Sequence, residues 1–511
     1  MADEKIPSPW EIQKDISDYL KRKYGDRVII PPQPDLVGDS GGDRTQREEP
    51  PLNIDFDLKP EELEAYLKQY VVNQDEAIEV LATKICTHFN RMRLEMSPGG
   101  PGELVGNIKN NVLMIGPTGV GKTFIVKLIA KKIGVPFVKG DATKFSETGY
   151  VGGDVEDLVR DLVREADGNI RLAECGIIYL DEIDKIASSG TVYGPDVSRT
   201  GVQRNLLKLM EESEVDLKTP HDLAAQMEAA MEAQRTGKVT RKKVNTKNIL
   251  FVVSGAFPEL EDIIRKRLKQ QPIGFKSEKS EPLANLDRQA LLKVVRSEDL
   301  IKYGFESEFV GRLPVVVCLN DLSVEDLYRI VKNPNSVVVQ AKKRDFVAYG
   351  IELEFEDEAL RRIAERAYAE RTGARGLVSA MERVLIKFEK KLPSTDIKKL
   401  TVTAAMVDNP GEELEKLLRQ HAIKAVQKRL LASTGVVVTF TDKAIEMISQ
   451  MAKEQGHPFE AVCNELLKDY EYGVKLLNRA EFKVDEKVVA DPKGRLEELI
   501  REAYHRRSQQ K

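Results

Sequence analysis

The sequence contains few cysteines and few histidines, and neither kind is clustered. The four cysteines, Cys86, Cys175, Cys318 and Cys463, lie far apart and form no C-x2-C pair. They are therefore expected to be reduced residues of the core. The five histidines are equally scattered. This distribution predicts neither a zinc site nor a cysteine–histidine nucleophile.

Long hydrophobic runs and a strong excess of one charge are also missing. No run has the length of a membrane span, and residues 1–9 lack the apolar core of a signal peptide. We therefore expect no membrane contact and a cytoplasmic location. The 79 basic and 83 acidic residues give a formal net charge of −4, which argues against nucleic acid as a partner. A chain of 511 residues is long enough for several domains.

One stretch stands out, because it follows an apolar run at 112–115 and precedes a helical pattern. Its residues are Gly116, Pro117, Thr118, Gly119, Val120, Gly121, Lys122 and Thr123, followed by Phe124. Glycines let a backbone wrap around a polyphosphate with its N–H groups inward, while the next helix presents its positive end. Lys122 would reach the β- and γ-phosphates, and the Thr123 hydroxyl would hold Mg²⁺. The stretch predicts an ATP-binding phosphate loop; a fortuitous turn is the alternative.

A second motif complements this loop. The buried-strand pattern at 177–180 ends at Asp181 and Glu182, which places two carboxylates at the edge of the sheet where α/β proteins bind ligands. Asp181 would hold Mg²⁺ through its water shell, and Glu182 would polarise the water that attacks the γ-phosphate. Together the motifs predict a nucleotide triphosphatase. A kinase would also need an acceptor site, of which the sequence shows no sign.

Apolar strands alternate with helical patterns in the first two thirds of the chain. Strands are expected at 112–115, 135–138, 177–180 and 249–253, after a helical stretch at 61–93. Such alternation predicts an α/β fold with a parallel sheet flanked by helices. The polar segment at 223–243 ends in a basic cluster, which is either a solvated face or a specific element.

The last third of the chain contains an internal repeat. The pattern of residues 350–363 recurs at 435–448, and apolar positions between 400 and 417 are echoed between 482 and 499. Each copy has the order strand, capped helix, helix, strand and final helix, which predicts two successive small α+β domains. Chance similarity between amphipathic segments is the alternative.

These motifs occur in an order that resembles the ClpX and HslU family of AAA+ unfoldases, over residues 61–418. Residues 70–74 are similar to the family's adenine-binding segment, so the resemblance implies that Val71 and Val72 contact the base. Asn73 stands where the family usually has glycine. Ser254 is similar to the sensor-1 position. The resemblance implies an AAA+ large domain followed by a small lid domain.

Two arginines lie in stretches that resemble further boxes of the family. Residues 308–314 resemble the arginine-finger box and residues 372–377 the sensor-2 box. The resemblance implies that Arg312 contacts the nucleotide of a neighbouring subunit, in a homohexamer, and that Arg375 contacts phosphate from the small domain. A guanidinium can satisfy two γ-phosphoryl oxygens as charge builds up in the transition state. For either arginine an ordinary ion pair is the alternative.

Residues 149–152 resemble the loop that lines the family's axial pore and pulls polypeptide. Tyr150 and Val151 stand between glycines, and an aromatic ring on a permissive backbone can grip many side chains without selecting among them. A buried tyrosine in a turn is the alternative. Residues 196–201 are similar to the second pore loop. Ile273, Gly274 and Phe275 stand where the family docks a ClpP-like peptidase; the alternative is a loop anchor.

Two departures from the family concern the ends of the chain. No cysteine precedes Cys86, so the family's zinc-binding recruitment domain is expected to be absent. In its place, Pro9 begins an amphipathic helix with the only tryptophan, Trp10, which either docks a partner or packs on the protein itself. At the other end, Glu460 takes the place of Arg375 in the second copy. A carboxylate repels phosphate, so this copy is not expected to sense nucleotide.

The sequence therefore predicts a Mg²⁺-ATP-driven ring unfoldase that pulls protein substrates through its pore and delivers them to a ClpP-like peptidase. The alternatives are a peptidase-independent remodelling chaperone and a scaffold whose assembly ATP controls. The expected domains are an N-terminal helix at 1–30, a linker at 31–60, the large ATPase domain at 61–325, the lid domain at 326–418 and its degenerate duplicate at 419–511.

Overall fold

The computed structural model describes residues 57–96, 109–146, 153–187, 197–217, 242–270, 287–477 and 480–509, all within the unit formed by residues 52–511. Several predicted features lie outside these ranges and stay predictions. They are the N-terminal helix, nearly all of the linker, Tyr150 and Val151, most of the polar segment at 223–243, and Ile273, Gly274 and Phe275.

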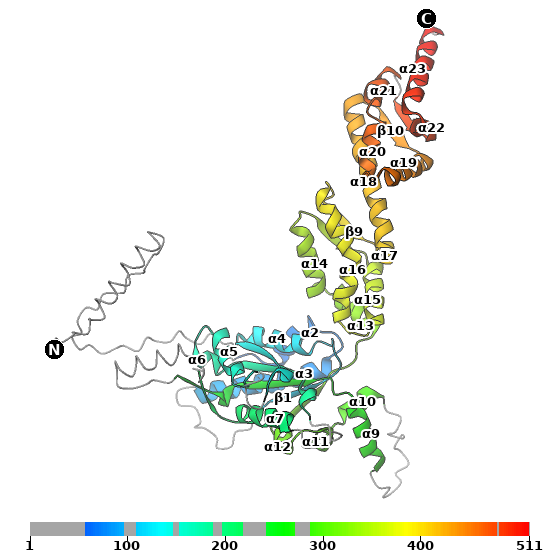
Figure 1. Ribbon diagram of the computed structural model, residues 1–511. Helices are drawn as coiled ribbons and strands as arrows, with labels where there is room; N and C mark the ends of the chain where they lie inside the picture. The colour runs from blue at the N-terminus through cyan, green and yellow to red at the C-terminus, as the bar shows by residue number, and fades with distance from the viewer. Residues whose placement is uncertain are drawn as a thin grey trace, which may run out of the picture. The chain divides into compact units, whose positions relative to one another are not determined.

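A parallel sheet of five strands, in the order β2-β3-β6-β1-β7, forms the centre of the ATPase region (Figure 1). The strands are β1 Val112–Ile115, β2 Phe137–Asp141, β3 Ile177–Asp181, β6 Leu250–Gly255 and β7 Val315–Cys318. The parallel sheet confirms the predicted α/β fold. The predicted strand at 135–138 begins two residues too early, because Pro136 has no N–H for the ladder. Strand β7 was not predicted, since its short run directly follows the arginine-finger box.

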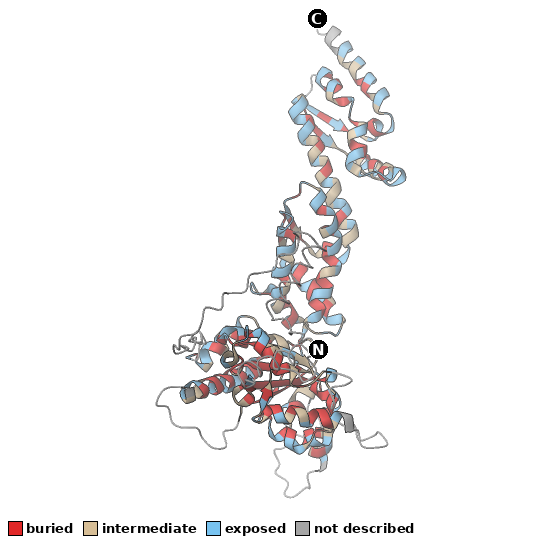
Figure 2. Cartoon of the chain, turned by 60° about the vertical axis from the view of Figure 1, so that its left-hand side comes forward, coloured by how far each residue is buried: buried red, intermediate tan, exposed pale blue. Residues whose placement is uncertain are grey.

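Helices cover both faces of this sheet, and successive residues of β1 pack in the two apolar clusters on its opposite faces. Val112 and Met114 belong to one apolar cluster, whereas Leu113 and Ile115 belong to another, because successive strand residues point to opposite faces. Figure 2 shows the buried residues concentrated in the sheet and on the inner sides of the helices. The first cluster takes in α2 Pro60–Lys68, α3 Asp75–Met96 and α4 Lys122–Ile133; the second takes in α5 Asp157–Glu165, α7 Val197–Met210, α9 Leu260–Gln270, α10 Arg288–Lys293, α11 Ser297–Tyr303 and α12 Ser307–Gly311.

The next region of the chain builds a two-stranded parallel sheet with helices around it. Its elements are α13 Val324–Lys332, α14 Val337–Val347, β8 Glu352–Phe355, α15 Asp357–Ala369, α16 Arg375–Lys391, β9 Lys399–Val402, α17 Ala404–Asp408 and α18 Pro410–Thr434. Its apolar residues join the cluster that also holds α2, α3 and α4. The core therefore continues from the ATPase region into this one.

The same order of strand and helix then recurs. The elements are β10 Val437–Phe440, α19 Asp442–Gln455, α20 Phe459–Leu466, α21 Tyr470–Leu477, β11 Glu481–Val484, α22 Glu486–Ala490 and α23 Pro492–Gln509. Strands β10 and β11 pair in parallel, as β8 and β9 do. Gly350 and Gly435, at matching places, both have left-handed backbones with φ of 72° and 74°. The copies differ where two short helices, α20 and α21, replace the single helix α16.

Helix α18 is shared between the two small regions. Leu414, in its first half, packs in the cluster of the first region, whereas Val426 and Leu430 pack in a separate cluster built only from residues 426–499. The proposed boundary at 418/419 falls inside this 25-residue helix. A continuous helix, rather than a loop, therefore joins the regions. Within the described ranges, no helix combines the length and apolar composition that a membrane crossing requires.

Candidate nucleotide site

The predicted phosphate loop connects β1 to α4, and two of its glycines are required by geometry. Gly119 and Gly121 have left-handed backbones, with φ of 80° and 99°, which residues with a Cβ atom rarely adopt. A Cβ atom on Gly119 would also lie 2.1 Å from the carbonyl oxygen of Thr372. The loop therefore has no room for a side chain at Gly119.

Lys122 begins α4 and is held against the loop that precedes it. Its Nζ donates to the carbonyl oxygens of Gly116 at 2.6 Å and Pro117 at 2.8 Å. Burial lowers the pKa of Lys122, although the nearby carboxylates of Asp181 and Asp184 oppose the shift. The ammonium group is thus held at the loop by two short, charge-assisted hydrogen bonds.

A chain of hydrogen bonds joins three predicted residues through a fourth that sequence reasoning missed. Thr123 Oγ1 donates to the Tyr179 hydroxyl at 3.1 Å, which lies 2.6 Å from Ser254 Oγ. Ser254 Oγ in turn donates to Asp181 Oδ1 at 2.9 Å. Burial raises the pKa of Tyr179 to about 12, so it stays a neutral donor and acceptor. Its strand pattern indicated only a core residue, because no local signal marks the hydroxyl's partners.

Asp181 is held as a carboxylate at the end of β3. Burial alone would raise its pKa, but hydrogen bonds from Ser254 and Lys139 outweigh burial and hold the pKa below its usual value. Lys139 Nζ lies 3.3 Å from Asp181 Oδ2. The neighbouring Glu182 has a left-handed backbone with φ of 57°, a conformation that non-glycine residues keep mainly where the surroundings enforce it.

The Thr123 hydroxyl and the Asp181 carboxylate, the predicted oxygen ligands for Mg²⁺, both line this site. Among the described residues, no group of three or more His, Cys, Asp or Glu side chains is placed to hold a metal ion. Mg²⁺ at nucleotide sites is bound through one or two protein ligands plus phosphates and waters. The Thr123 hydroxyl and the Asp181 carboxylate therefore fit a metal ion that binds together with the nucleotide phosphates.

A cavity of about 430 Å³ lies beside these groups. The predicted residues that line it are Thr118, Gly119, Gly121, Lys122, Thr123, Phe124, Asp181, Glu182 and Arg375. Tyr70, from the stretch that resembles the adenine-binding segment, also lines it, and the apolar residues Ile330, Val337, Val338 and Val378, which were not predicted, extend the wall. Ligand sites commonly combine such an apolar wall with a few polar groups. The predicted residues that do not line this cavity are Val71, Val72, Gly116, Pro117, Val120, Ser254 and Arg312.

Arg375 reaches the cavity because its segment packs directly on the phosphate loop. The N–H of Ala374 donates to the carbonyl oxygen of Gly119 at 2.9 Å. Gly373 has a left-handed backbone with φ of 61°, and a Cβ atom there would lie 2.8 Å from the same oxygen. A close contact between backbone atoms therefore brings the start of α16 to the loop.

The segment that contains Tyr70 is tied to the connection between β7 and α13. Asn73 has a left-handed backbone with φ of 58°, and its Nδ2 donates to Asp326 Oδ2 at 2.9 Å. Gln74 and Asn320 exchange two hydrogen bonds, of 2.9 and 2.8 Å. Asparagine tolerates this conformation almost as glycine does, which explains the departure from the family at Asn73. The wall beside the cavity is therefore linked to the start of the small region.

Arg312 lies away from the cavity of its own chain. It follows α12, its side chain is 53% exposed, and its Nη2 forms an ion pair of 2.5 Å with Glu211 Oε1. Such a surface pair contributes little to stability. The guanidinium is therefore available to another molecule at little cost.

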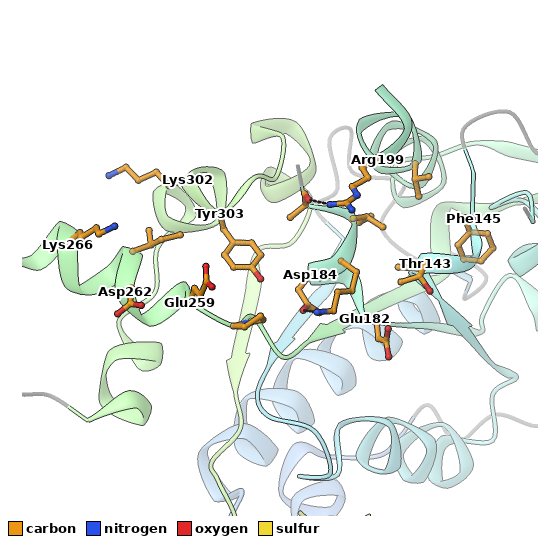
Figure 3. A pocket seen from close by; sticks show the side chains of 17 residues that line it. Thr143, Phe145, Glu182, Asp184, Arg199, Glu259, Asp262, Lys266, Lys302 and Tyr303 are labelled. Atoms are coloured by element: carbon orange, nitrogen blue, oxygen red, sulfur yellow. Dashed lines mark hydrogen bonds and ion pairs between the residues drawn. The ribbon is translucent and has the colours of Figure 1, made fainter. Parts of the chain in front are cut away.

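Glu182 also borders a second, larger cavity of about 910 Å³ (Figure 3). Glu182, Asp184 and Lys185 line both cavities. Phe145 and Arg199 also line the second cavity, and they lie close in sequence to residues 147–152 and 188–196. Residues 197–201, part of the predicted second pore loop, form the first turns of α7. The segment of residues 182–185 thus lies between the nucleotide cavity and the second cavity. The second cavity is also lined by residues near the ends of both predicted pore loops.

The comparisons with known proteins first define the class. Residues 107–316 match the AAA domain (Cdc48 subfamily), and residues 322–393 match the C-terminal, D2-small domain of ClpB protein. The chain is therefore an AAA+ ATPase, which confirms the predicted enzyme class.

The relatives then define the family. The chain is 36% identical over 357 residues to the ATP-dependent Clp protease ATP-binding subunit ClpX of Treponema denticola, covering 69% of this chain and 82% of that protein. It is 38% identical over 364 residues to ClpX 3 of Methylococcus capsulatus, with 68% and 80% covered, and 38% identical over 374 residues to ClpX of Borrelia duttonii, with 73% and 83% covered. The chain belongs to the ClpX family of ATP-dependent unfoldases.

Proposed function

We propose that this ATPase works as a homohexameric ring that hydrolyses Mg²⁺-ATP to unfold proteins and pull them through an axial pore. The observation that carries the proposal is that the phosphate loop, Asp181, Glu182 and Arg375 border one cavity although they come from distant parts of the sequence. Membership of the ClpX family supports the coupling of this site to protein unfolding.

Each residue of the site has a defined task in this proposal. The amides of the loop and Lys122 bind the phosphates, and Arg375 contacts them from the small region. Thr123 and Asp181 hold Mg²⁺, which screens the phosphate charge when bound. Ser254 and Tyr179 keep Asp181 oriented through their hydrogen bonds. Glu182 orients and polarises the attacking water as a general base.

Arg312 supports a shared site between subunits. It does not line the cavity of its own chain, and its side chain is half exposed. In the proposed ring it reaches the γ-phosphate in the neighbouring subunit and stabilises the charge of the transition state. An arginine in this role is worth about 10³- to 10⁵-fold in rate.

The second cavity supports the coupling between hydrolysis and pulling. It extends from Glu182 to Phe145 and Arg199, so a rearrangement at Glu182 has a direct structural route to the stems of both predicted pore loops. Tyr150 and Val151 are proposed to grip the polypeptide. Peptidase docking through Ile273, Gly274 and Phe275 is part of the same proposal, and a protein that contacts no ClpP-like peptidase would be a remodelling chaperone.

One experiment with two variants tests the proposal, using ATP turnover in the presence of unfolded polypeptide and unfolding of a tagged, folded substrate. Glu182→Gln is expected to bind ATP and to lose turnover by about 10²- to 10⁴-fold, because the general base is removed. Tyr150→Ala is expected to keep turnover and to lose unfolding.

Glu165→Gln, an exposed change at the end of α5, serves as the control and is expected to match the wild type in both assays. A wild type that hydrolyses no ATP would refute the proposal. Undiminished unfolding by Tyr150→Ala would remove Tyr150 from its role, and substantial turnover by the wild type would exclude the scaffold alternative.

A further inference from the structure

Asn111 is a buried asparagine that directly precedes β1 and that the nucleotide site does not use. The residue is 1% exposed. Burying an amide is costly unless both its donor and its acceptor are paired. In Asn111 both are paired with backbone groups, and these groups belong to two different segments. The amide therefore links parts of the chain that are far apart in sequence.

The acceptor of this amide faces β6. Asn111 Oδ1 accepts a hydrogen bond of 3.2 Å from the N–H of Phe251, a fully buried residue of that strand. The same strand carries Ser254, whose hydroxyl donates to Asp181 in the nucleotide site. Because Oδ1 is turned toward Phe251, the Nδ2 atom of the same planar amide is left to meet a different neighbour.

The donor of the amide holds the backbone of Arg312. Asn111 Nδ2 donates to the carbonyl oxygen of Arg312 at 3.1 Å. The carbonyl oxygen of Asn111 also accepts, at 3.4 Å, from the N–H of Val315, the first residue of β7. One residue therefore holds both ends of the short connection between α12 and β7.

The parallel sheet explains why Arg312 lies away from its own nucleotide cavity. Strands β1 and β7 pair in parallel with Val112 opposite Val315, so Arg312 lies at the amino ends of these strands, beside Asn111. The phosphate loop begins at Gly116, at the carboxyl end of β1, which four residues of strand place about 13 Å further along. Asn111 thus holds Arg312 at the edge of the sheet opposite the phosphate loop.

We propose that Asn111 is a positioning residue that aims Arg312 at the nucleotide of the neighbouring subunit. The inference rests on the proposed function. The Asn111 amide fixes the carbonyl group of Arg312, and with it the backbone from which the side chain starts, while Glu211 pairs with the guanidinium at 2.5 Å. Asparagine suits this position because a neutral amide donates and accepts at once, whereas an ionised aspartate of the same size only accepts.

The test begins with Asn111→Asp, which keeps an acceptor for the N–H of Phe251 but loses the donor for the carbonyl group of Arg312. ATP turnover is expected to fall by about 10- to 100-fold, because a small misplacement of a reacting group costs that much. The Kd of a fluorescent ATP analogue is expected to stay within about twofold of the wild type, since the phosphate loop is unchanged.

Asn90→Leu is the matched control, because it also removes a side-chain amide of the ATPase region. The Asn90 amide donates to the carbonyl oxygens of Leu58 and Cys86. The variant therefore loses hydrogen bonds that involve neither Arg312 nor the nucleotide cavity, and it is expected to keep the turnover of the wild type.

Two mixtures reveal the site through which Asn111 acts. Mixed with Glu182→Gln, Asn111→Asp is expected to regain about a quarter of wild-type turnover, because in about one site in four an intact Glu182 meets a well-placed Arg312 of its neighbour. Mixed with Arg312→Ala, it is expected to stay inactive, because neither protein supplies a well-placed arginine.

Other outcomes of the mixtures would overturn the inference. Recovery with Arg312→Ala but not with Glu182→Gln would show that Asn111 serves the nucleotide site of its own subunit. Recovery in neither mixture would assign Asn111 to the fold alone, and wild-type turnover of Asn111→Asp by itself would deny it any role at Arg312. If Asn111→Asp does not fold, Asn111→Ser, which adds no charge, takes its place with the same expected pattern.

A mixture of Glu182→Gln with Arg312→Ala serves as the reference. Recovery in the reference mixture without recovery of Asn111→Asp by Glu182→Gln would refute this inference alone. A reference mixture that stays inactive after verified subunit exchange, or a wild type without turnover, would refute the proposed function instead.

Discussion

At the residue scale, Asn73 shows how one side chain meets two demands. Its left-handed backbone favours glycine or asparagine, and its amide also donates to the buried carboxylate of Asp326. Glycine would meet the first demand only. Asparagine at this place therefore fastens the segment beside the nucleotide cavity to the start of α13.

Asn73→Ala is expected to lower the free energy of unfolding by about 1–3 kcal/mol, because alanine is strained at this φ and leaves Asp326 with one donor fewer. Asn73→Gly is the matched control, since it relieves the strain and loses only the hydrogen bond. Urea unfolding of both variants measures the difference. Equal stability of wild type and Asn73→Ala would contradict this explanation.

At the element scale, the contact between the phosphate loop and the start of α16 builds the site. It consists of backbone atoms, with Ala374 donating to Gly119 and no space for a Cβ atom at Gly373. Because α16 begins at Arg375, any movement of this contact also moves the guanidinium relative to the phosphate loop. The position of one helix therefore decides whether the site is complete.

Gly373→Ala is expected to weaken ATP binding about tenfold or more, because the new methyl group pushes α16 away from the loop. Gly435→Ala provides a control with the same left-handed backbone but with nothing within 4 Å of the added Cβ atom. It is expected to cost stability of about 1–2 kcal/mol and to leave ATP binding unchanged. Titration with a fluorescent ATP analogue compares them, and equal affinities would refute the role of this contact.

At the scale of the whole molecule, the proposed ring gives a role to Arg312, which lies apart from the cavity of its own chain. Lys122, Glu182 and Arg375 border one cavity, whereas Arg312 lies elsewhere, beside Glu211. A subunit alone therefore lacks one of the groups that the proposed transition state requires. The second small region has an apolar core of its own, because the C-terminal half of α18 packs in a separate cluster.

Mixing two inactive variants tests the shared site. Glu182→Gln and Arg312→Ala are each expected to lose turnover, by about 10²-fold or more. Mixed rings contain interfaces in which an intact Glu182 meets an intact Arg312 of the neighbour, so turnover is expected to return. The assay is ATP hydrolysis after the two proteins are exchanged at equal concentrations. Mixtures that stay inactive, although subunit exchange is verified, would contradict a site shared between subunits.

Prediction from the sequence was most successful where local patterns carry the information. The phosphate loop, Asp181 and Glu182 were placed correctly at the end of parallel strands, because a strand, a loop and a helix that follow one another need no distant contact. Tyr179 and the apolar wall around Val337 and Val338 were missed. Their positions depend on packing between segments far apart in the chain, and their own neighbourhoods indicate only core residues.

The sequence by itself determined that this protein binds a nucleotide, because glycine spacing and paired carboxylates are chemical requirements that short segments satisfy. The tertiary structure alone decided that Tyr179 links Thr123 to Ser254 and that the carbonyl oxygen of Gly119 accepts from the N–H of Ala374. The physical reason is that a hydrogen bond acts over about 3 Å, a distance that only folding can impose on residues far apart in sequence.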